Sequence, residues 1–402
     1  MKVAFVTPRY GTEVIGGAES AARMLAERLV HDLSWEAEVF STCALDYVSW
    51  DDHFVPGTSD LNGVRVHRFR TRSGRRPEYY ALDARVKGSP RSATLDEARE
   101  WVELQGPICP DLVDAALESA CDVMSFYPYL YYPTVATIPL ARRPSVLHPA
   151  AHDEPAMYLK VFSETFASAD AFAYHTVSER RLVQKIHPVA EVPQAVLGLG
   201  VAEPCPAGRS GAEISGVGDR PYLCSLGRVD DHKGSTMLAA FFREYKKRRP
   251  GPLALVMVGS VAASIPEHPD IVLTGGVSEE DKWDILAGAS ALVSPSAYES
   301  FSLVIMEAWL QSVPVIVNET CAVTVEHCER SGGGISFGSY YSFEACVDTL
   351  MSKPHAREVL AASGKRYVES NYSWPALVRK FESFYTGVAA RGRKSVAGRN
   401  RG

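Results

Sequence analysis

The sequence predicts an α/β protein of two domains, each built around a mainly parallel β-sheet. Short apolar runs alternate with stretches of helical periodicity along most of the chain, which is typical of parallel sheets covered by helices. The 402 residues exceed what one ordinary hydrophobic core accommodates. Between Pro193 and Gly218 the pattern loosens into a run rich in glycine and proline, which marks the natural linker.

The first domain is expected to span residues 1–200. Its opening strand, Lys2–Thr7, is continuously apolar, as in a sheet covered on both faces, and a helix at Ala18–Val30 follows it. Thr71–Ser92 is rich in arginine, glycine and proline and is expected to be a surface loop or flexible excursion. The remaining expected strands and helices are Ala37–Ser41, Val64–Phe69, Val123–Phe126, Ser145–His148, Tyr158–Ala167, Ala171–Tyr174 and Ser178–Ile186.

The second domain is expected to span residues 201–371. Its first strand ends at Leu226, and a helix follows at Ser235–Lys247. A C-terminal helix at 372–390 and a basic, glycine-rich, disordered tail at 391–402 complete the chain. The other expected elements are Leu253–Gly259, Ile271–Thr274, Ser278–Ala287, Ala291–Ser294, Leu303–Gln311, Val313–Val317, Ser342–Ser352, Ala356–Ser370 and Trp374–Tyr385.

Composition narrows the class of protein. The net charge of -6 argues against nucleic acid as the main partner, because duplex binding needs clustered surplus lysine and arginine. The basic tail is compatible with weak contact to an anionic membrane surface, but no apolar run approaches the roughly 20 residues that span a bilayer. The N-terminus is too short and strand-like for a signal peptide, and the eight cysteines include no C-x-x-C pair. We therefore expect a cytoplasmic protein with reduced thiols.

A strand, a polar turn and a helix start follow one another over Ala291–Trp309. Unpaired N–H groups at such a helix start form a site for negatively charged ligands. Two carboxylates, Glu299 and Glu307, bracket this change of structure and are expected to face hydroxyl groups rather than phosphate. The combination indicates a sugar ligand that carries phosphate. Taken alone, the stretch also fits a helix with one acid near its N-terminus, favoured by the helix dipole.

Arg228 and Lys233 lie in the loop between the second domain's first strand and its helix. When a sugar nucleotide reacts, negative charge gathers on the departing diphosphate, and fixed cations stabilise that transition state. Each charge-assisted hydrogen bond contributes on the order of 1.5–3 kcal/mol. A site of this kind needs no metal. Asp230 and Asp231 are expected to structure the loop, and Cys321, His327 and Cys328 lack a second cluster of ligands.

Two features of the first domain occupy ligand-binding positions. Gly16 and Gly17 stand at a helix entrance, where backbone can approach a ligand closely, although the dinucleotide fingerprint is absent and a plain tight turn is an alternative. His152 follows the strand Ser145–His148 at its carboxyl end, where open α/β sheets bind ligands. The alternative there is a helix cap formed by Asp153 or Glu154.

These motifs resemble the retaining GT-B glycosyltransferases with the E-x7-E motif, also described as family 4-like or group 1. The resemblance rests on Gly227-Arg-Val-Asp-Asp-His-Lys-Gly234, on Glu299 and Glu307, on Gly16-Gly17 and on His152-Asp153. It covers nearly the whole chain and is most specific in the second domain. It implies a GT-B fold in which two Rossmann-like domains face each other across a deep cleft, with the C-terminal helix crossing back to the first domain.

The resemblance also implies roles for single residues. Arg228 and Lys233 would bind the donor diphosphate, Glu307 the ribose, and Glu299 the transferred sugar. Many relatives carry glycine where this chain has Ser300 and Ser302, which indicates a narrower pocket or an altered donor preference. The implied catalytic residues are His152, Glu299, Arg228 and Lys233. The implied donor-binding residues are Gly16, Gly17, Arg228, Lys233, Val277, Glu299, Phe301, Ser302, Leu303 and Glu307.

The sequence therefore predicts a retaining, metal-independent glycosyltransferase without a cofactor. It would move a hexose-type sugar from a UDP- or GDP-linked donor to an acceptor hydroxyl, and the mechanism that the resemblance implies is front-face attack. The acceptor, a small molecule, a glycan or a lipid-linked sugar, and the oligomeric state stay open. Two alternatives remain: a sugar-nucleotide epimerase on the same fold, and a non-catalytic sugar-nucleotide-binding protein.

Overall fold

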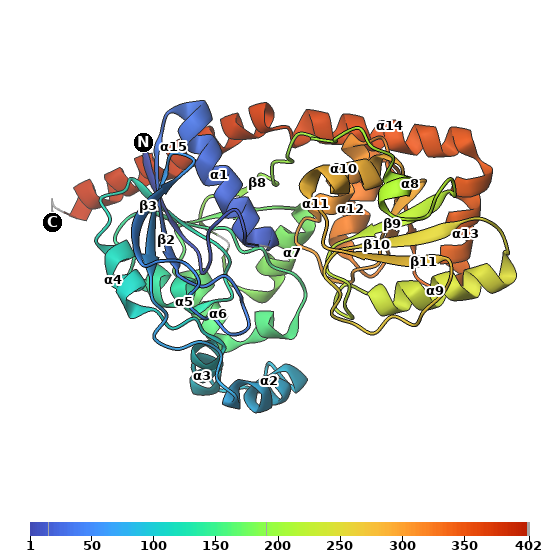
Figure 1. Cartoon of the computed structure of the whole chain (residues 1–402). Helices are drawn as coiled ribbons and strands as arrows, with labels where there is room; N and C mark the ends of the chain where they lie inside the picture. Colours follow the sequence, from blue (N-terminus) through green and yellow to red (C-terminus); the bar gives the residue numbers. More distant parts are fainter. Residues whose placement is uncertain (15, 190, 400–402) are drawn as a thin grey trace. The chain divides into compact units, whose positions relative to one another are not determined.

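The computed structural model describes residues 1–14, 16–189 and 191–399. It divides into two compact units, coloured by sequence in Figure 1. One unit comprises Met1–Gly200 together with Trp374–Gly402, and the other comprises Val201–Ser373. Each unit contains one largely parallel sheet with helices packed on it, which confirms the predicted α/β class.

The sheet of the first unit has eight strands in the order β3-β4-β2-β1-β5-β6-β7-β8. All neighbours are parallel except β3 and β4, which pair antiparallel. The exposed strand β3 has the polar sequence Gly-Thr-Ser-Asp-Leu, which carries no apolar alternation and was not predicted. The strands are Lys2–Val6 (β1), Glu36–Thr42 (β2), Gly57–Leu61 (β3), Val64–Phe69 (β4), Val123–Phe126 (β5), Ser145–Leu147 (β6), Ala171–Tyr174 (β7) and Gln194–Val196 (β8).

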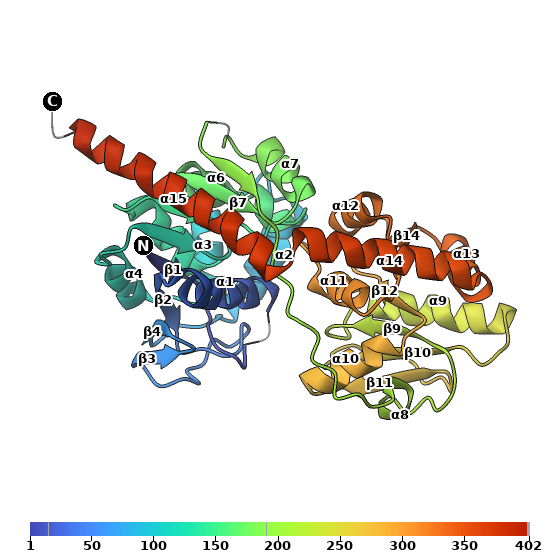
Figure 2. The same ribbon diagram turned by 90° about the horizontal axis from the view of Figure 1, so that it is seen from above.

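Helices cover both faces of this sheet. The helix α1 packs against β2 and lies beside the C-terminal helix α15, which Figure 2 shows running along the first unit. On the other side, α3, α4 and α6 enclose a large apolar core with strands β1, β5 and β7. The helices are Gly17–Leu33 (α1), Glu78–Gly88 (α2), Leu95–Gln105 (α3), Pro110–Leu117 (α4), Tyr132–Thr137 (α5), Ile138–Leu140 (η1), Pro155–Tyr158 (η2), Lys160–Ala167 (α6), Val177–Ile186 (α7) and Trp374–Arg399 (α15).

Two expectations for the first unit need correction. The stretch Thr71–Ser92, expected to be a loop, contains α2, which projects together with α3 in Figure 1. The buried residues Tyr79 and Leu82 of α2 belong to the same core as Trp101 of α3. Contacts between residues distant in the sequence therefore fix the conformation of this stretch.

The tail 391–402 was expected to be disordered, but α15 continues to Arg399, because alanine, arginine and lysine favour helix there. Residues 400–402 lie outside the described part of the chain.

The sheet of the second unit has six parallel strands in the order β11-β10-β9-β12-β13-β14. Its strands are Tyr222–Leu226 (β9), Ala254–Val258 (β10), Ile271–Gly275 (β11), Ala291–Ser294 (β12), Val315–Asn318 (β13) and Gly334–Phe337 (β14). Helices α9 and α13 pack on one face around Phe242 and Phe343. The helices are Gly211–Ile214 (α8), Ser235–Arg248 (α9), Glu279–Ala287 (α10), Leu303–Leu310 (α11), Ala322–Ser331 (α12), Tyr340–Ser352 (α13) and Pro354–Asn371 (α14).

Strand order determines where each unit can bind a ligand. The direction of strand succession reverses between β1 and β5 in the first sheet and between β9 and β12 in the second. Loops leaving the carboxyl ends of strands on the two sides of such a reversal diverge and leave a crevice, which is where open α/β sheets bind ligands. Within the described residues, no helix is long and apolar enough to cross a membrane.

Tyr385 joins α15 to the sheet of the first unit and gives a test of that packing. Its buried hydroxyl lies 2.7 Å from Ser125 Oγ and 2.8 Å from His148 Nε2. We predict that Tyr385→Phe lowers the free energy of unfolding by about 1–3 kcal/mol, because two buried polar groups lose their partner. The measurement is urea denaturation. Tyr341→Phe, whose side chain is 73% exposed, is the control and should stay within about 0.5 kcal/mol of wild type. Equal midpoints for the two variants would contradict the prediction.

Candidate functional site

The loop after β9 is held in shape by Asp230. One carboxylate oxygen of Asp230 accepts a hydrogen bond from the backbone N–H of Lys233 at 2.8 Å, and the other pairs with Nε of Arg228. The loop ends at Gly234, which has φ 75°. A Cβ atom at Gly234 would lie 2.6 Å from the carbonyl oxygen of Pro295, so only glycine lets this loop pass the turn after β12. The loop-structuring role predicted for Asp230 is therefore seen.

An ion pair connects these two loops. Lys233 Nζ lies 2.7 Å from Glu299 Oε1, across a separation of 66 residues in the sequence. The Glu299 side chain is 15% exposed and the Lys233 side chain 42% exposed, so the carboxylate is mostly enclosed while the ammonium still reaches solvent. The structure thus brings together three of the predicted site residues, Arg228, Lys233 and Glu299, at the reversal between β9 and β12.

The helix α11 begins directly after Ser302, one of the two predicted departures from glycine. Ser302 has φ 70°, in the left-handed region that favours glycine. Its hydroxyl is buried and has no hydrogen-bond partner in the described part of the chain. The neighbouring Phe301 side chain packs edge-on against His327 and Tyr372, each at 5.0 Å between ring centroids. Any contact of Phe301 with a ligand would therefore come from its backbone.

Glu307 sits inside α11 and is paired with a residue that the sequence reasoning missed. Lys282 Nζ on α10 lies 3.0 Å from Glu307 Oε1 and 2.7 Å from Glu279 Oε2. Burial raises the pKa of Glu307, and Lys282 partly opposes this effect. For Lys282, burial acts to lower the pKa, but Glu307 and Glu279 together raise it. The sequence analysis expected the two glutamates to face hydroxyl groups, and it did not foresee that each of them also pairs with a lysine.

Val277 and Leu303 complete the predicted residues of the second unit. Val277 is half-buried in the turn between β11 and α10, and this turn follows Gly275, the last residue of β11, which has φ 71°. Ser278 caps α10 by accepting a hydrogen bond from the backbone N–H of Asp281 at 3.1 Å. Leu303 is the first residue of α11 and is half-buried. Both residues therefore flank helix starts on the carboxyl side of the sheet.

In the first unit, Gly16 lies against a buried ion pair that the sequence reasoning also missed. Arg9 Nη2 lies 2.5 Å from Glu19 Oε1, and both side chains are 6% exposed. A Cβ atom at Gly16 would lie 2.3 Å from Glu19 Oε2, whereas at Gly17 it would meet nothing within 4 Å. Gly16 therefore admits the ion pair at the start of α1, and Gly17 leaves the backbone open. The sequence contains two signals for this ion pair. Glu19 is an acid two residues after Gly16-Gly17, and Arg9 is an arginine just after the first strand.

His152 lies in the loop between β6 and η2. Its Nδ1 is 3.7 Å from Glu154 Oε1, and Glu154 also accepts a hydrogen bond from the hydroxyl of Tyr129 at 2.9 Å. Asp153 accepts one from the hydroxyl of Tyr158 at 2.6 Å. Among the described residues, no side chain caps η2, so the capping alternative for Asp153 and Glu154 is not supported.

Glu179, at the start of α7, fixes the loop that carries His152. Its carboxylate accepts backbone hydrogen bonds from Ala151 at 2.8 Å and from His175 at 2.6 Å. Burial raises the pKa of Glu179 to about 8, while these N–H groups favour the ionised form. The residue before His152 is thereby tied to a different element of the first unit.

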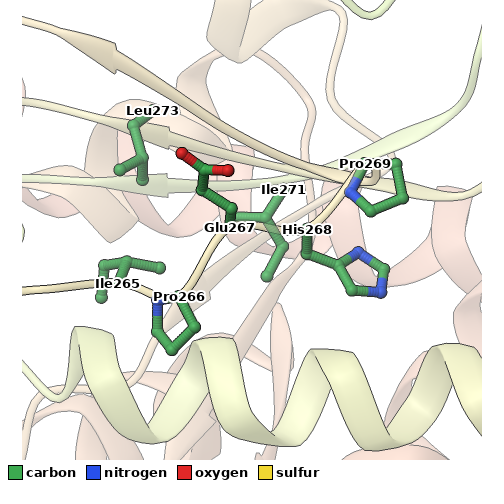
Figure 3. A pocket seen from close by; sticks show the side chains of 7 residues that line it. All are labelled: Ile265, Pro266, Glu267, His268, Pro269, Ile271 and Leu273. Carbon is green, nitrogen blue, oxygen red and sulfur yellow. The ribbon is translucent and has the colours of Figure 1, made fainter.

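A hollow of about 580 Å³ opens beside the edge strand β11, where Glu267 and His268 point to different sides (Figure 3). None of the predicted donor residues lines it; the lining residues are Ile265, Pro266, Glu267, His268, Pro269, Ile271 and Leu273. Within the described residues, no group of three or more His, Cys, Asp or Glu side chains could hold a metal ion.

Comparison with solved structures identifies the fold. Sucrose-phosphate synthase from Thermosynechococcus elongatus aligns with a TM-score of 0.69 at 15% identity, covering 97% of this chain and 99% of that chain. HepE of Anabaena, in complex with UDP and glucose, aligns with a TM-score of 0.65 at 13% identity, covering 96% and 100%. The chain has the GT-B fold.

Sequence comparison supplies the family. Residues 212–367 match the family model of the glycosyl transferases group 1. Trehalose synthase of Rubrobacter xylanophilus is 26% identical over 40% of this chain and 42% of its own length. The GDP-mannose-dependent alpha-(1-6)-phosphatidylinositol monomannoside mannosyltransferase of Mycolicibacterium smegmatis is 24% identical over 40% and 47%. The chain thus spans less than half the length of these two relatives. The GT-B fold and the match of residues 212–367 together support a glycosyltransferase of group 1.

Ser302 gives a test of the site's backbone. We predict that Ser302→Gly raises the free energy of unfolding by about 1 kcal/mol, because glycine relieves the left-handed conformation and removes a buried unpaired hydroxyl. The greater freedom of glycine in the unfolded chain offsets part of this gain. Ser312→Gly is the matched control, since Ser312 has φ 58° but is exposed. Denaturant unfolding should show a larger gain at 302 than at 312, and a loss of stability at 302 would refute this account.

Proposed function

We propose that this protein transfers a hexose-type sugar, with retention of configuration, from a UDP- or GDP-linked donor to an acceptor hydroxyl. The observation that carries the proposal is the ion pair of Lys233 with Glu299 beside the Arg228 loop, at the reversal of the second sheet. The family match covers this same unit. Among the similar proteins, HepE is described with UDP and glucose and the mannosyltransferase as GDP-mannose-dependent, which supports this donor class.

Arg228 and Lys233 are the groups we assign to the diphosphate. An ammonium group has three donors, and Glu299 takes one from Lys233, whose side chain is 42% exposed. Asp230 holds Arg228 through Nε, so the cation is oriented before a ligand arrives. Negative charge on the diphosphate grows as the bond to the sugar breaks, and prepositioned cations stabilise that charge without reorganising. The same charge stabilisation lets the reaction proceed without a metal.

The two glutamates are assigned to the two sugars of the donor. Glu299 faces the transferred sugar and at the same time holds Lys233 in place. Glu307, fixed by Lys282, accepts hydrogen bonds from the ribose diol. Val277 and the backbone N–H groups at Phe301–Leu303 line the remainder of the donor site. In the first unit, the Gly16-Gly17 loop and His152 are assigned to the reacting sugar. In the front-face mechanism the leaving diphosphate itself accepts the proton of the acceptor hydroxyl.

The proposal is tested by incubating the protein with UDP- and GDP-sugars and a panel of acceptors in excess EDTA. We expect release of the nucleotide diphosphate and a product whose anomeric configuration, read by NMR, equals that of the donor. Inversion of configuration or a strict requirement for metal would contradict the mechanism. Isomerisation of the donor without any acceptor would instead indicate an epimerase, and binding without release or transfer a non-catalytic protein.

Lys233→Ala tests the assigned cation directly. We predict that kcat falls by about 10²–10³-fold, as on removal of one donor that stabilises a developing negative charge. Steady-state kinetics with the best donor measure this effect, and circular dichroism checks that the fold persists. The control is Lys247→Ala on α9, which removes a lysine that is 71% exposed and should leave kcat unchanged. Near-normal turnover of Lys233→Ala would remove Lys233 from the mechanism.

A further inference from the structure

The first unit contains a buried arginine that no acid neutralises. Arg68 on β4 is 9% exposed, and its Nη1 atom is buried with no hydrogen-bond partner among the described residues. The other buried cations in the described part of the chain are compensated. Arg9 pairs with Glu19 at 2.5 Å, and Lys246 pairs with Asp270 at 3.2 Å. Arg68 is the exception.

The surroundings of Arg68 leave its charge largely uncompensated. The ring of Phe54 covers the guanidinium at 3.8 Å from its centroid. The acid that attracts it is Glu13, an exposed residue outside ion-pair distance. A buried cation without a partner costs several kcal/mol, and such costs persist where a ligand supplies the missing charge. Arg68 therefore has the properties of a binding residue rather than a packing residue.

Strand register places a second unpaired polar group beside Arg68. In the parallel pairing of β2 with β4, Val39 lies opposite Val66 and Ser41 opposite Arg68. The paired side chains share one face of the sheet, so the apolar pair is followed by a polar pair toward the carboxyl ends of both strands. The hydroxyl of Ser41 is buried and has no hydrogen-bond partner in the described residues.

Tyr10 contributes a third group from the loop after β1, the neighbour of β2. Its side chain is fully buried, and its hydroxyl has no hydrogen-bond partner among the residues described. Burial and the carboxylate of Glu27 raise the pKa of Tyr10, and the cations Arg23 and Arg68 oppose this effect. The hydroxyl therefore stays protonated and can donate. The loop that contains Tyr10 also leads to the Gly16-Gly17 helix entrance.

We propose that Arg68, Ser41 and Tyr10 bind an anionic group of the acceptor, a phosphate monoester or a carboxylate. The description of this ligand as the acceptor rests on the proposed function, whereas the binding of an anion at these residues does not. A guanidinium binds both oxyanions through two parallel hydrogen bonds, and the two hydroxyls are suitable further donors. The position also fits, because the site lies at the carboxyl ends of β1, β2 and β4, on the ligand-binding edge of the sheet.

The test uses Arg68→Met in the full chain. Methionine keeps much of the volume beside Phe54 and removes the charge. The matched control is Arg65→Met, three residues earlier on the same strand, where the side chain is exposed and faces the opposite side of the sheet. Binding of a hexose 6-phosphate, a hexuronate, inorganic phosphate and a neutral hexose is measured by calorimetry and thermal shift at constant ionic strength.

We expect an anionic probe to bind wild type and the Arg65→Met control, with at least 10-fold weaker binding to Arg68→Met and to the neutral hexose. Comparison of the affinities for the phosphate probes and for the hexuronate shows which anion the site binds. Without a probe, Arg68→Met should have a Tm equal to or above that of wild type, because an unpaired buried cation is removed. Equal anion affinity of Arg68→Met and wild type, or no anion binding by wild type, overturns the proposal.

Failure of the two proposals can be told apart. If anionic probes bind through Arg68 but no sugar is transferred from any donor, the proposed function fails and the anion site stands. If sugar is transferred and Arg68→Met leaves kcat/KM for the acceptor unchanged, the anion site fails and the transferase stands. Donor affinity, measured separately with UDP- and GDP-sugars, should be the same in Arg68→Met and wild type.

Discussion

The ion pair of Lys233 with Glu299 is the interaction on which the organisation of the second unit's site depends. It joins the loops that leave β9 and β12, the two strands on either side of the reversal in strand order. Gly234 makes the approach possible, because any side chain there would meet the Pro295 carbonyl. The same carbonyl accepts a hydrogen bond from Asn318 Nδ2 at 2.9 Å, which ties the turn to β13. A cation and a carboxylate are thus held in place by the sheet before any ligand binds.

Buried charge serves two purposes in this chain. Where charges are paired, they fix backbone: Arg9 with Glu19 shapes the entrance to α1, and Lys282 with Glu307 links α10 to α11. Glu179 does the same through backbone N–H groups next to His152. Where a charge is unpaired, as at Arg68, it costs stability and is best explained by a ligand.

Much of the fold followed from the sequence, because apolar strands and helical periodicity are local signals. Arg228, Lys233 and Glu299 could also be selected, since each stands in a loop after a predicted strand. Their pairing could not be predicted. Lys282 stands 25 residues before Glu307, and nothing in its local pattern distinguishes it from a solvated helix lysine. Arg68 is the penultimate residue of an ordinary alternating strand, and only the register with Ser41 reveals its surroundings. The helix α2 was missed because distant contacts outweigh its loop-like flanks.

The account's central claim is that the second unit binds the donor at the Lys233–Glu299 pair. The most direct measurement is a thermal-shift screen of the wild-type chain with UDP-, GDP-, ADP- and dTDP-sugars, followed by a co-crystal structure with the sugar nucleotide that raises Tm most. The account predicts stabilisation by a UDP- or GDP-sugar, with the diphosphate on Lys233 and Arg228 and the transferred sugar at Glu299. A donor bound elsewhere, or no stabilisation by any of the four, would contradict it.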